Sequence, residues 1–233
     1  MTTELNLILL PGLDGSGVLF RPLLPHLPAE WQPVVVSYPP DEALSYEDLL
    51  PLVLSRLPTD APFAILGESF SGPLAIMAAA TRPPNLRRVI LSASFIRSPL
   101  WFRLKGLHRL IYPQLLVGFP LLARAKTLLS RHSTPEVRQL LREALAEVQP
   151  EVLAERLRSV LLVDVSKQLV ECPVPILYLR GDEDFVVPHH NAAEIQALAP
   201  SMQIAKIPAP HLVMQTQPAL AAAAMAEFLM AAT

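Results

Sequence analysis

The stretch of this chain with the clearest chemical potential is the hexapeptide GESFSG at 67–72. It follows an apolar run at 62–66 and precedes a helix-like run at 73–80. A serine between small residues at such a junction is the layout of a nucleophile elbow, whose tight turn lifts the hydroxyl above a sheet. The usual spacing is Gly-x-Ser-x-Gly, and a serine, which is still small, takes the last position here. We therefore expect Ser69 to be a nucleophile. Ser71 is the weaker candidate because a proline stands two residues after it.

A serine hydroxyl needs a base that takes its proton and an acid that orients that base. In nucleophile-elbow proteins the chain order is Ser, then Asp or Glu, then His. Downstream of Ser69, an apolar run at 176–179 leads into an acidic turn at 182–184, and a run at 203–207 leads into His211. Both candidates therefore follow the carboxyl end of an expected strand. The sequence predicts a Ser-His-Asp hydrolytic site.

Glycine is scarce and clustered in this chain. Five of its 8 glycines lie at 12–17 and 67–72, whereas the chain has 25 prolines. Clustered glycine in a glycine-poor protein indicates tight turns or close backbone approach. Neither the dinucleotide fingerprint after a strand nor a P-loop is present, so phosphate binding is not indicated.

Apolar runs of strand length alternate with helix-length segments. Near-continuous apolar strands are typical of parallel sheets covered on both faces, and the alternation predicts an α/β fold with a mostly parallel, doubly wound sheet. Ligands of such sheets bind beyond the carboxyl ends of the strands, where the glycine turns fall. The expected strands are 5–10, 33–37, 63–66, 89–92, 176–179 and 203–207, and the expected helices are 18–27, 45–57, 70–81, 190–198 and 218–232.

One block breaks this alternation. From 96 to 170 the pattern is helical and punctuated by prolines, which is too long for a single crossover between strands. We interpret it as a helical cap insertion. The expected domains are thus an α/β core made of 1–95 and 171–233, and a cap of 96–170.

Composition narrows the functional classes. With 52% hydrophobic and 17% charged residues, the 233-residue chain can bury a sizeable core. A net charge of −2 gives no reason to expect nucleic acid as a partner. Cys172 is the only cysteine, so no intrachain disulfide is expected, and no signal or membrane-spanning stretch stands out. A cytoplasmic protein is the resulting expectation.

These motifs together resemble the α/β-hydrolase superfamily, in particular its small lipase and esterase-like members, over 5–232. The turn LPGLDG at 10–15 stands where the family has its first oxyanion loop, with a proline in place of the frequent histidine. The resemblance implies Ser69 as nucleophile, His211 as base, and Asp184, three residues after a glycine, as acid, with Asp182 as its rival. It also implies oxyanion donors in the backbone N–H groups of Leu13 and Phe70, and neither cofactor nor metal.

Several polar residues stay open at this stage. Glu68 and Asp14 are expected either to line the floor of a pocket or to bond to loop amides. His189 and His190 fit the start of a helix better than a metal site, since no third ligand accompanies them.

The cap has a lopsided charge. Between 97 and 142 nine basic residues face a single acid, Glu136: Arg97, Arg103, Lys105, Arg109, Arg124, Lys126, Arg131, Arg138 and Arg142. A solvated face usually mixes signs. We therefore expect this surface either to be solvent-exposed with no binding role, or to attract an anionic acyl carrier or an anionic membrane surface.

The predicted activity is that of a serine hydrolase, a carboxylesterase or lipase-like enzyme that cleaves carboxylic esters with the acyl chain under the cap and an acyl-enzyme on Ser69. Two alternatives remain at this point. One is a thioesterase or acyltransferase that acts on carrier-bound acyl groups, and the other is a non-catalytic binding protein with the hydrolase fold.

Overall fold

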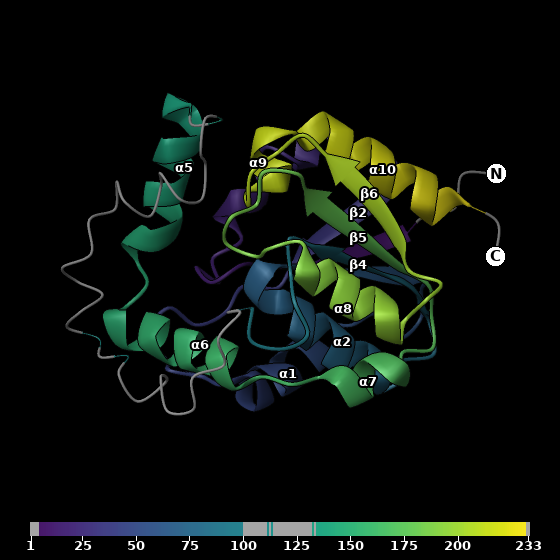
Figure 1. Cartoon of the computed structure of the whole chain (residues 1–233), viewed down its shortest axis with the longest axis horizontal. Helices are drawn as coiled ribbons and strands as arrows, with labels where there is room; N and C mark the ends of the chain where they lie inside the picture. The colour runs from purple at the N-terminus through teal and green to yellow at the C-terminus, as the bar shows by residue number, and fades with distance from the viewer. Residues whose placement is uncertain (1–4, 100–110, 112, 114–131, 133, 232–233) are drawn as a thin grey trace.

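The structure is a computed structural model that describes residues 5–99, 111, 113, 132 and 134–231 (Figure 1). Its centre is a six-stranded sheet in the order β2-β1-β3-β4-β5-β6, and every neighbouring pair is parallel. This confirms the expected α/β architecture. The strands are β1 (Leu5–Leu10), β2 (Trp31–Val35), β3 (Phe63–Glu68), β4 (Leu86–Ser92), β5 (Ile176–Gly181) and β6 (Gln203–Ile207).

Helices cover both faces of the sheet, as Figure 1 shows. Successive strand residues point to opposite faces, so Ile8 and Ile65 join one core while Leu7 and Leu66 join the other. The first core is closed by α1 (Tyr46–Leu54), α2 (Gly72–Ala80), α7 (Ser166–Val170) and α8 (His190–Leu198). The second is closed by two 3-10 turns, η1 (Val18–Phe20) and η2 (Leu24–His26), with α9 (Val213–Thr216) and α10 (Pro218–Met230).

The main difference from the expected elements lies at 18–27, where a single helix was predicted. The structure has η1 and η2 instead. Pro22 and Pro25 lack the N–H that an α-helix would need, so short turns replace it. The short helix α9, directly after His211, was not predicted.

The cap segment leaves the sheet after β4 and returns beside its own starting point. Val165 donates a backbone hydrogen bond of 2.9 Å to the carbonyl of Ile96, and Arg97 pairs with Asp164 at 3.1 Å. Between these points the structure describes two helices, α5 (Pro135–Ala146) and α6 (Pro150–Leu162). The next helix, α7, packs against α2 and α8 of the core. Most of 100–131 lies outside the described residues.

Candidate active site

The turn after β3 places Ser69 at the carboxyl edge of the sheet. Ser69 has a φ of 47°, a left-handed conformation that is uncommon for residues other than glycine. Little room surrounds this turn, because a Cβ added to Gly67 would lie 2.5 Å from the carbonyl oxygen of Ser71. A Cβ on Gly72 would clash with the Ser94 hydroxyl. The two glycines therefore allow the strained turn that presents the serine.

Three residues that the sequence singled out lie together here. The Nε2 atom of His211 is 2.9 Å from Ser69 Oγ, and its Nδ1 atom is 2.9 Å from Asp184 Oδ2. The pair is well shielded, with 5% of the His211 side chain and 2% of the Asp184 side chain exposed. An imidazole held between a hydroxyl and a buried carboxylate can take a proton from one while the other fixes its orientation.

The acidic turn separates its two aspartates clearly. Asp184 Oδ1 accepts hydrogen bonds from the backbone N–H groups of Val186 and Val187 at 2.8 and 2.9 Å, which leaves Oδ2 for the histidine. Asp182 is exposed and pairs with Arg180 at 2.9 Å. The structure thus brings Asp184, and not its rival, to His211.

Of the two predicted oxyanion donors, Phe70 directly follows Ser69, and Leu13 lies in the loop after β1, the strand that pairs with β3. Neither the N–H of Leu13 nor that of Phe70 donates to an acceptor among the described residues. The loop carrying Leu13 is fastened to the elbow by Ser71, whose hydroxyl donates to the carbonyl of Pro11 and also lies 2.6 Å from the Tyr38 hydroxyl. The serine that replaces the usual second glycine of the motif therefore joins the elbow to this loop.

Asp14 and Glu68, which the sequence left open, are both buried beside the loop. Asp14 Oδ2 accepts hydrogen bonds from the backbone and the hydroxyl of Ser16, so this carboxyl does bond a loop amide. Glu68 Oε1 accepts from Gln215 Nε2 at 2.8 Å. Burial, with the neighbouring Asp14 carboxyl, raises the pKa of Glu68 to about 7, and burial also raises the pKa of Asp14.

Sequence reasoning missed Arg156 altogether. This residue of α6 is 1% exposed, and its guanidinium donates to the carbonyls of Leu13, Asp14 and Pro39, each at 2.9 Å. The available signal was its spacing, because Arg156 falls four residues after buried Val152 and three before buried Ser159, on the inward face of the helix. A cation on the buried face of a helix indicates a specific partner.

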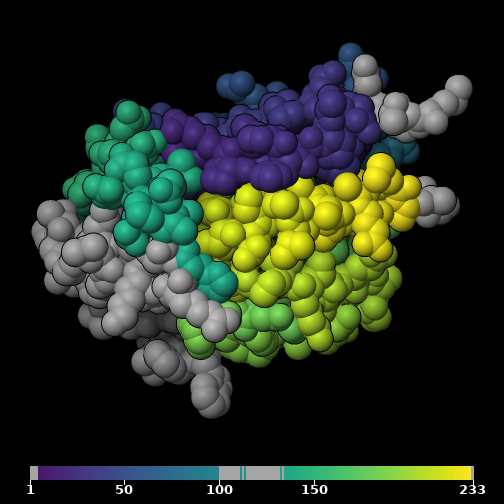
Figure 2. All heavy atoms as spheres, turned by 90° about the horizontal axis from the view of Figure 1, so that it is seen from above, coloured from purple at the N-terminus to yellow at the C-terminus, as the bar shows by residue number. Residues whose placement is uncertain are grey.

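The cap helices cover the same edge of the sheet. Val137, Leu141 and Ala144 of α5 pack with Leu19 and with Leu212, the neighbour of His211. Val152 and Leu153 of α6 pack with Leu13. Figure 2 shows the teal surface of the cap lying against the purple N-terminal segment, in agreement with the contact between α5 and η1.

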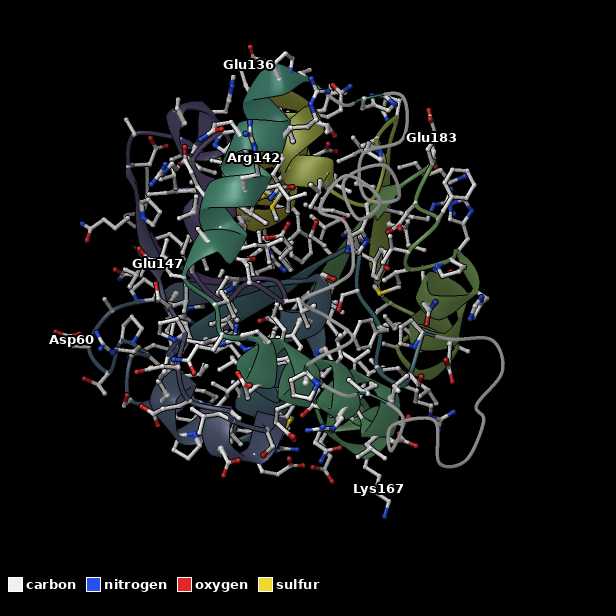
Figure 3. The ribbon with its side chains drawn as sticks, turned by 90° about the vertical axis from the view of Figure 1, so that its left-hand side faces the viewer. Asp60, Glu136, Arg142, Glu147, Lys167 and Glu183 are labelled. Carbon is white, nitrogen blue, oxygen red and sulfur yellow. The ribbon has the colours of Figure 1, made fainter. Side chains whose placement is uncertain are left out.

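The basic surface expected on the cap is reduced in the structure. Arg97 is not part of an open basic face, because it forms salt bridges with Asp164 and with Glu194 of α8. Helix α5 carries side chains of both charges. Figure 3 labels Glu136 and Arg142 on the helix and Glu147 just after it. The other members, Arg103, Lys105, Arg109, Arg124, Lys126 and Arg131, lie outside the described residues.

The described residues offer neither a metal-binding cluster nor a membrane-spanning helix. No group of three or more His, Cys, Asp or Glu side chains is arranged to hold a metal ion. None of the described helices is long and apolar enough to cross a membrane. His189 and His190 stand at the start of α8, as expected.

The parallel sheet and the serine turn at its carboxyl edge define an α/β-hydrolase. A family model described as serine aminopeptidase, S33 (Hydrolase_4) matches residues 45–212, and the chain belongs to this family.

Curated relatives include the pimeloyl-[acyl-carrier protein] methyl ester esterases of Photobacterium profundum and Xanthomonas axonopodis pv. citri. The first is 30% identical over 84% of this chain and 82% of that protein. The second is 29% identical over 84% and 83%. The chain is thus an enzyme, a hydrolase of the carboxylesterase type.

Solved structures agree on the fold. A bromoperoxidase from Bacillus anthracis superposes with a TM-score of 0.83 at 16% identity, over 99% of this chain and 93% of that one. An esterase from Exiguobacterium antarcticum also has a TM-score of 0.83, at 13% identity over 99% and 94%. At such identities the likeness concerns the fold alone.

Proposed function

We propose that the enzyme hydrolyses a carboxylic ester, preferably the methyl ester of an acyl chain held on an acyl carrier protein, through a Ser69-linked acyl-enzyme. The observation that carries the chemistry is the position of His211, whose two ring nitrogens lie 2.9 Å from Ser69 Oγ and 2.9 Å from Asp184 Oδ2. The names of the relatives support the carrier-bound methyl ester as substrate.

In the first half-reaction His211 Nε2 accepts the proton of Ser69 as Oγ bonds to the ester carbonyl carbon. Asp184 stabilises the imidazolium that forms. The backbone N–H groups of Leu13 and Phe70 hold the oxyanion. When the intermediate collapses, the bond to the alcohol oxygen breaks, and the His211 proton leaves with the alcohol.

In the second half-reaction water replaces the alcohol. His211 Nε2 takes one of its protons, and the hydroxide oxygen bonds to the acyl carbon. The acyl–Oγ bond then breaks, and Ser69 recovers its proton from His211. The products are a carboxylic acid and a free enzyme, with no further reactant required.

The acyl chain is proposed to lie between the cap and the sheet edge. Leu13 packs against α6 and Leu212 against α5, so apolar side chains adjoin both the oxyanion loop and the base. Apolar walls with few polar groups suit an alkyl chain. We therefore retain the prediction that 96–170 acts as a cap over a core of 1–95 and 171–233, although α7 packs with the core helices.

The test uses a dicarboxylic acyl chain bound to a carrier protein at one end and carrying a methyl ester at the other. Release of methanol, with the carrier still acylated, is the expected result. Release of the carrier thiol with the methyl ester intact would instead establish the thioesterase alternative. Ser69→Ala is the matched control. A wild-type protein that cleaves neither bond and escapes fluorophosphonate labelling would be a binding protein.

A further inference from the structure

Two buried carboxyl groups approach each other behind the proposed nucleophile. Glu68 immediately precedes Ser69 and is 3% exposed, and Asp14 immediately follows Leu13 and is 4% exposed. A methyl group added to Gly12 would lie 3.6 Å from Asp14 Oδ1 and 4.0 Å from Glu68 Oε2. One oxygen of each carboxyl group thus lies within 4.0 Å of the same point beside Gly12, in the proposed oxyanion loop, residues 11–14.

In each carboxyl group, the oxygen near Gly12 is the one that lacks a hydrogen-bond partner in the described part of the chain. Glu68 Oε1 is bound by Gln215 and Asp14 Oδ2 by Ser16, whereas Oε2 and Oδ1 have no hydrogen-bond partner in the described part of the chain. A buried acceptor without a donor is costly. Two ionised carboxylates at such a site cost more, because the low dielectric strengthens their repulsion.

Few other charges in the described part of the chain face this pair. Arg156 from α6 acts on Asp14, and His211, beyond β6, acts on Glu68. Tyr38 is also near Asp14, but burial holds the pKa of its hydroxyl far above neutrality. Gln215 from α9 is neutral. Arg156 carries one positive charge, which balances one of these two carboxylates but not both.

We propose that Glu68 and Asp14 hold a single proton between them in the resting enzyme, so that only one of the two carboxyl groups is ionised, and that this charge state keeps the loop 11–14 in position against β3. This assignment rests on the oxyanion role proposed for Leu13. Loss of the proton leaves two negative charges close to Gly12, and their repulsion pushes the loop away from β3.

The raised pKa of Glu68 sets the direction of the pH dependence. The folded state holds this proton more tightly than the unfolded chain, whose glutamate has an ordinary pKa of 4.5. The unfolding free energy therefore falls as pH rises from about 4.5 to about 7, and stays at the lower level above that. Glu68→Gln keeps the shape and the donor but cannot ionise, so it lacks this decline.

The main experiment compares thermal unfolding of the wild type and Glu68→Gln from pH 5 to pH 9. The Tm of the variant minus that of the wild type should grow with pH, by on the order of 5 °C. Glu47→Gln, the same change at an exposed position of α1, is the matched control and should give a flat difference. A flat difference for Glu68→Gln as well would overturn the proposal, since a site filled by water or a cation predicts that result.

Two further measurements keep the test decisive. In infrared spectra at pH 6 the wild type should show a protonated carboxyl band that disappears by pH 9 and is absent from Glu68→Gln. Its absence from the wild type at pH 6 would refute the shared proton even if the variant did not fold. Neither the infrared band nor Tm requires turnover of a substrate. Both therefore test the shared proton even if the proposed esterase activity is wrong.

The kinetic readout reports positioning. The ratio of kcat at pH 9 to kcat at pH 7 should be at least fivefold higher in Glu68→Gln than in wild type, with KM little changed. Should Tm respond as expected while the two kcat profiles coincide, the proton is shared but does not position the oxyanion loop, and that part of the proposal is wrong.

Discussion

The guanidinium of Arg156 donates a 2.9 Å hydrogen bond to the backbone carbonyl of Leu13, across 143 positions of sequence. It also binds the carbonyl of Asp14, so a cap helix holds the loop that carries a proposed oxyanion donor. A planar fork of donors reaches several carbonyls at once, which a lysine ammonium at that position cannot reproduce. Helix α6 of the proposed cap is therefore fastened to the proposed oxyanion loop.

We expect Arg156→Lys to lower kcat at least tenfold while KM changes little, because the loop loses its anchor but the acyl site remains. Steady-state kinetics on a small neutral ester measures both. Arg158→Lys is the control on the same helix, since Arg158 is partly exposed and pairs with Glu155. Equal effects of the two substitutions would show that Arg156 only supports helix α6.

Ser69→Ala and His211→Ala should each lower ester turnover by several orders of magnitude, because triad members act as a unit. The double variant should be no slower than the slower single one. Thermal unfolding should confirm that all three variants are folded. Ordinary turnover by Ser69→Ala would place the nucleophile elsewhere.

The two acids of the 182–184 turn should differ sharply. Asp184→Asn alters the partner of His211 Nδ1 and should impair kcat strongly. Asp182→Asn affects only a partly exposed pair with Arg180 and should be mild. The measurement is kcat for both variants on one ester, and the reverse ranking would refute the assignment of the acid.

Ser71→Ala should destabilise the fold by about 1–3 kcal/mol, because the Tyr38 hydroxyl and the Pro11 carbonyl are left buried without their partner. Adding Tyr38→Phe should cost less than it does alone, and urea unfolding of the four proteins measures this coupling. Ser55→Ala, at an exposed helix end, is the control. Strict additivity would mean that the two hydroxyls are independent.

If an anionic carrier docks on the cap, turnover of the carrier-bound ester should fall as salt rises to ~0.15 M, where charges more than about 8 Å apart are screened. Arg142→Glu should reproduce that loss at low ionic strength. Lys167→Glu is the same charge reversal at an exposed site away from α5, as Figure 3 shows, and should not. A small neutral ester should be insensitive to both. Equal responses from the two variants, or from the two substrates, would dismiss α5 as the docking site.

The sequence predicted the parts of this molecule that local pattern controls. Strands β1 and β6 have the expected bounds because each is a short run that ends at a proline, Pro11 or Pro208. Ser69, Asp184 and His211 converge because parallel strands end at one edge of the sheet. Contacts between distant segments could not be foreseen. Arg97 counted as part of a basic surface until folding brought Asp164 and Glu194 to it.

The hydrogen bond between Val165 and Ile96 holds the two ends of the proposed cap segment side by side. The segment between these two residues can therefore be lengthened, shortened or replaced without a change in the strand order of the sheet. Such a replacement has one requirement. It must supply a hydrogen-bond donor to the carbonyls of Leu13 and Asp14, which Arg156 binds in this structure. A replacement segment that keeps a donor in the place of Arg156 is thus compatible with the same sheet and the same loop.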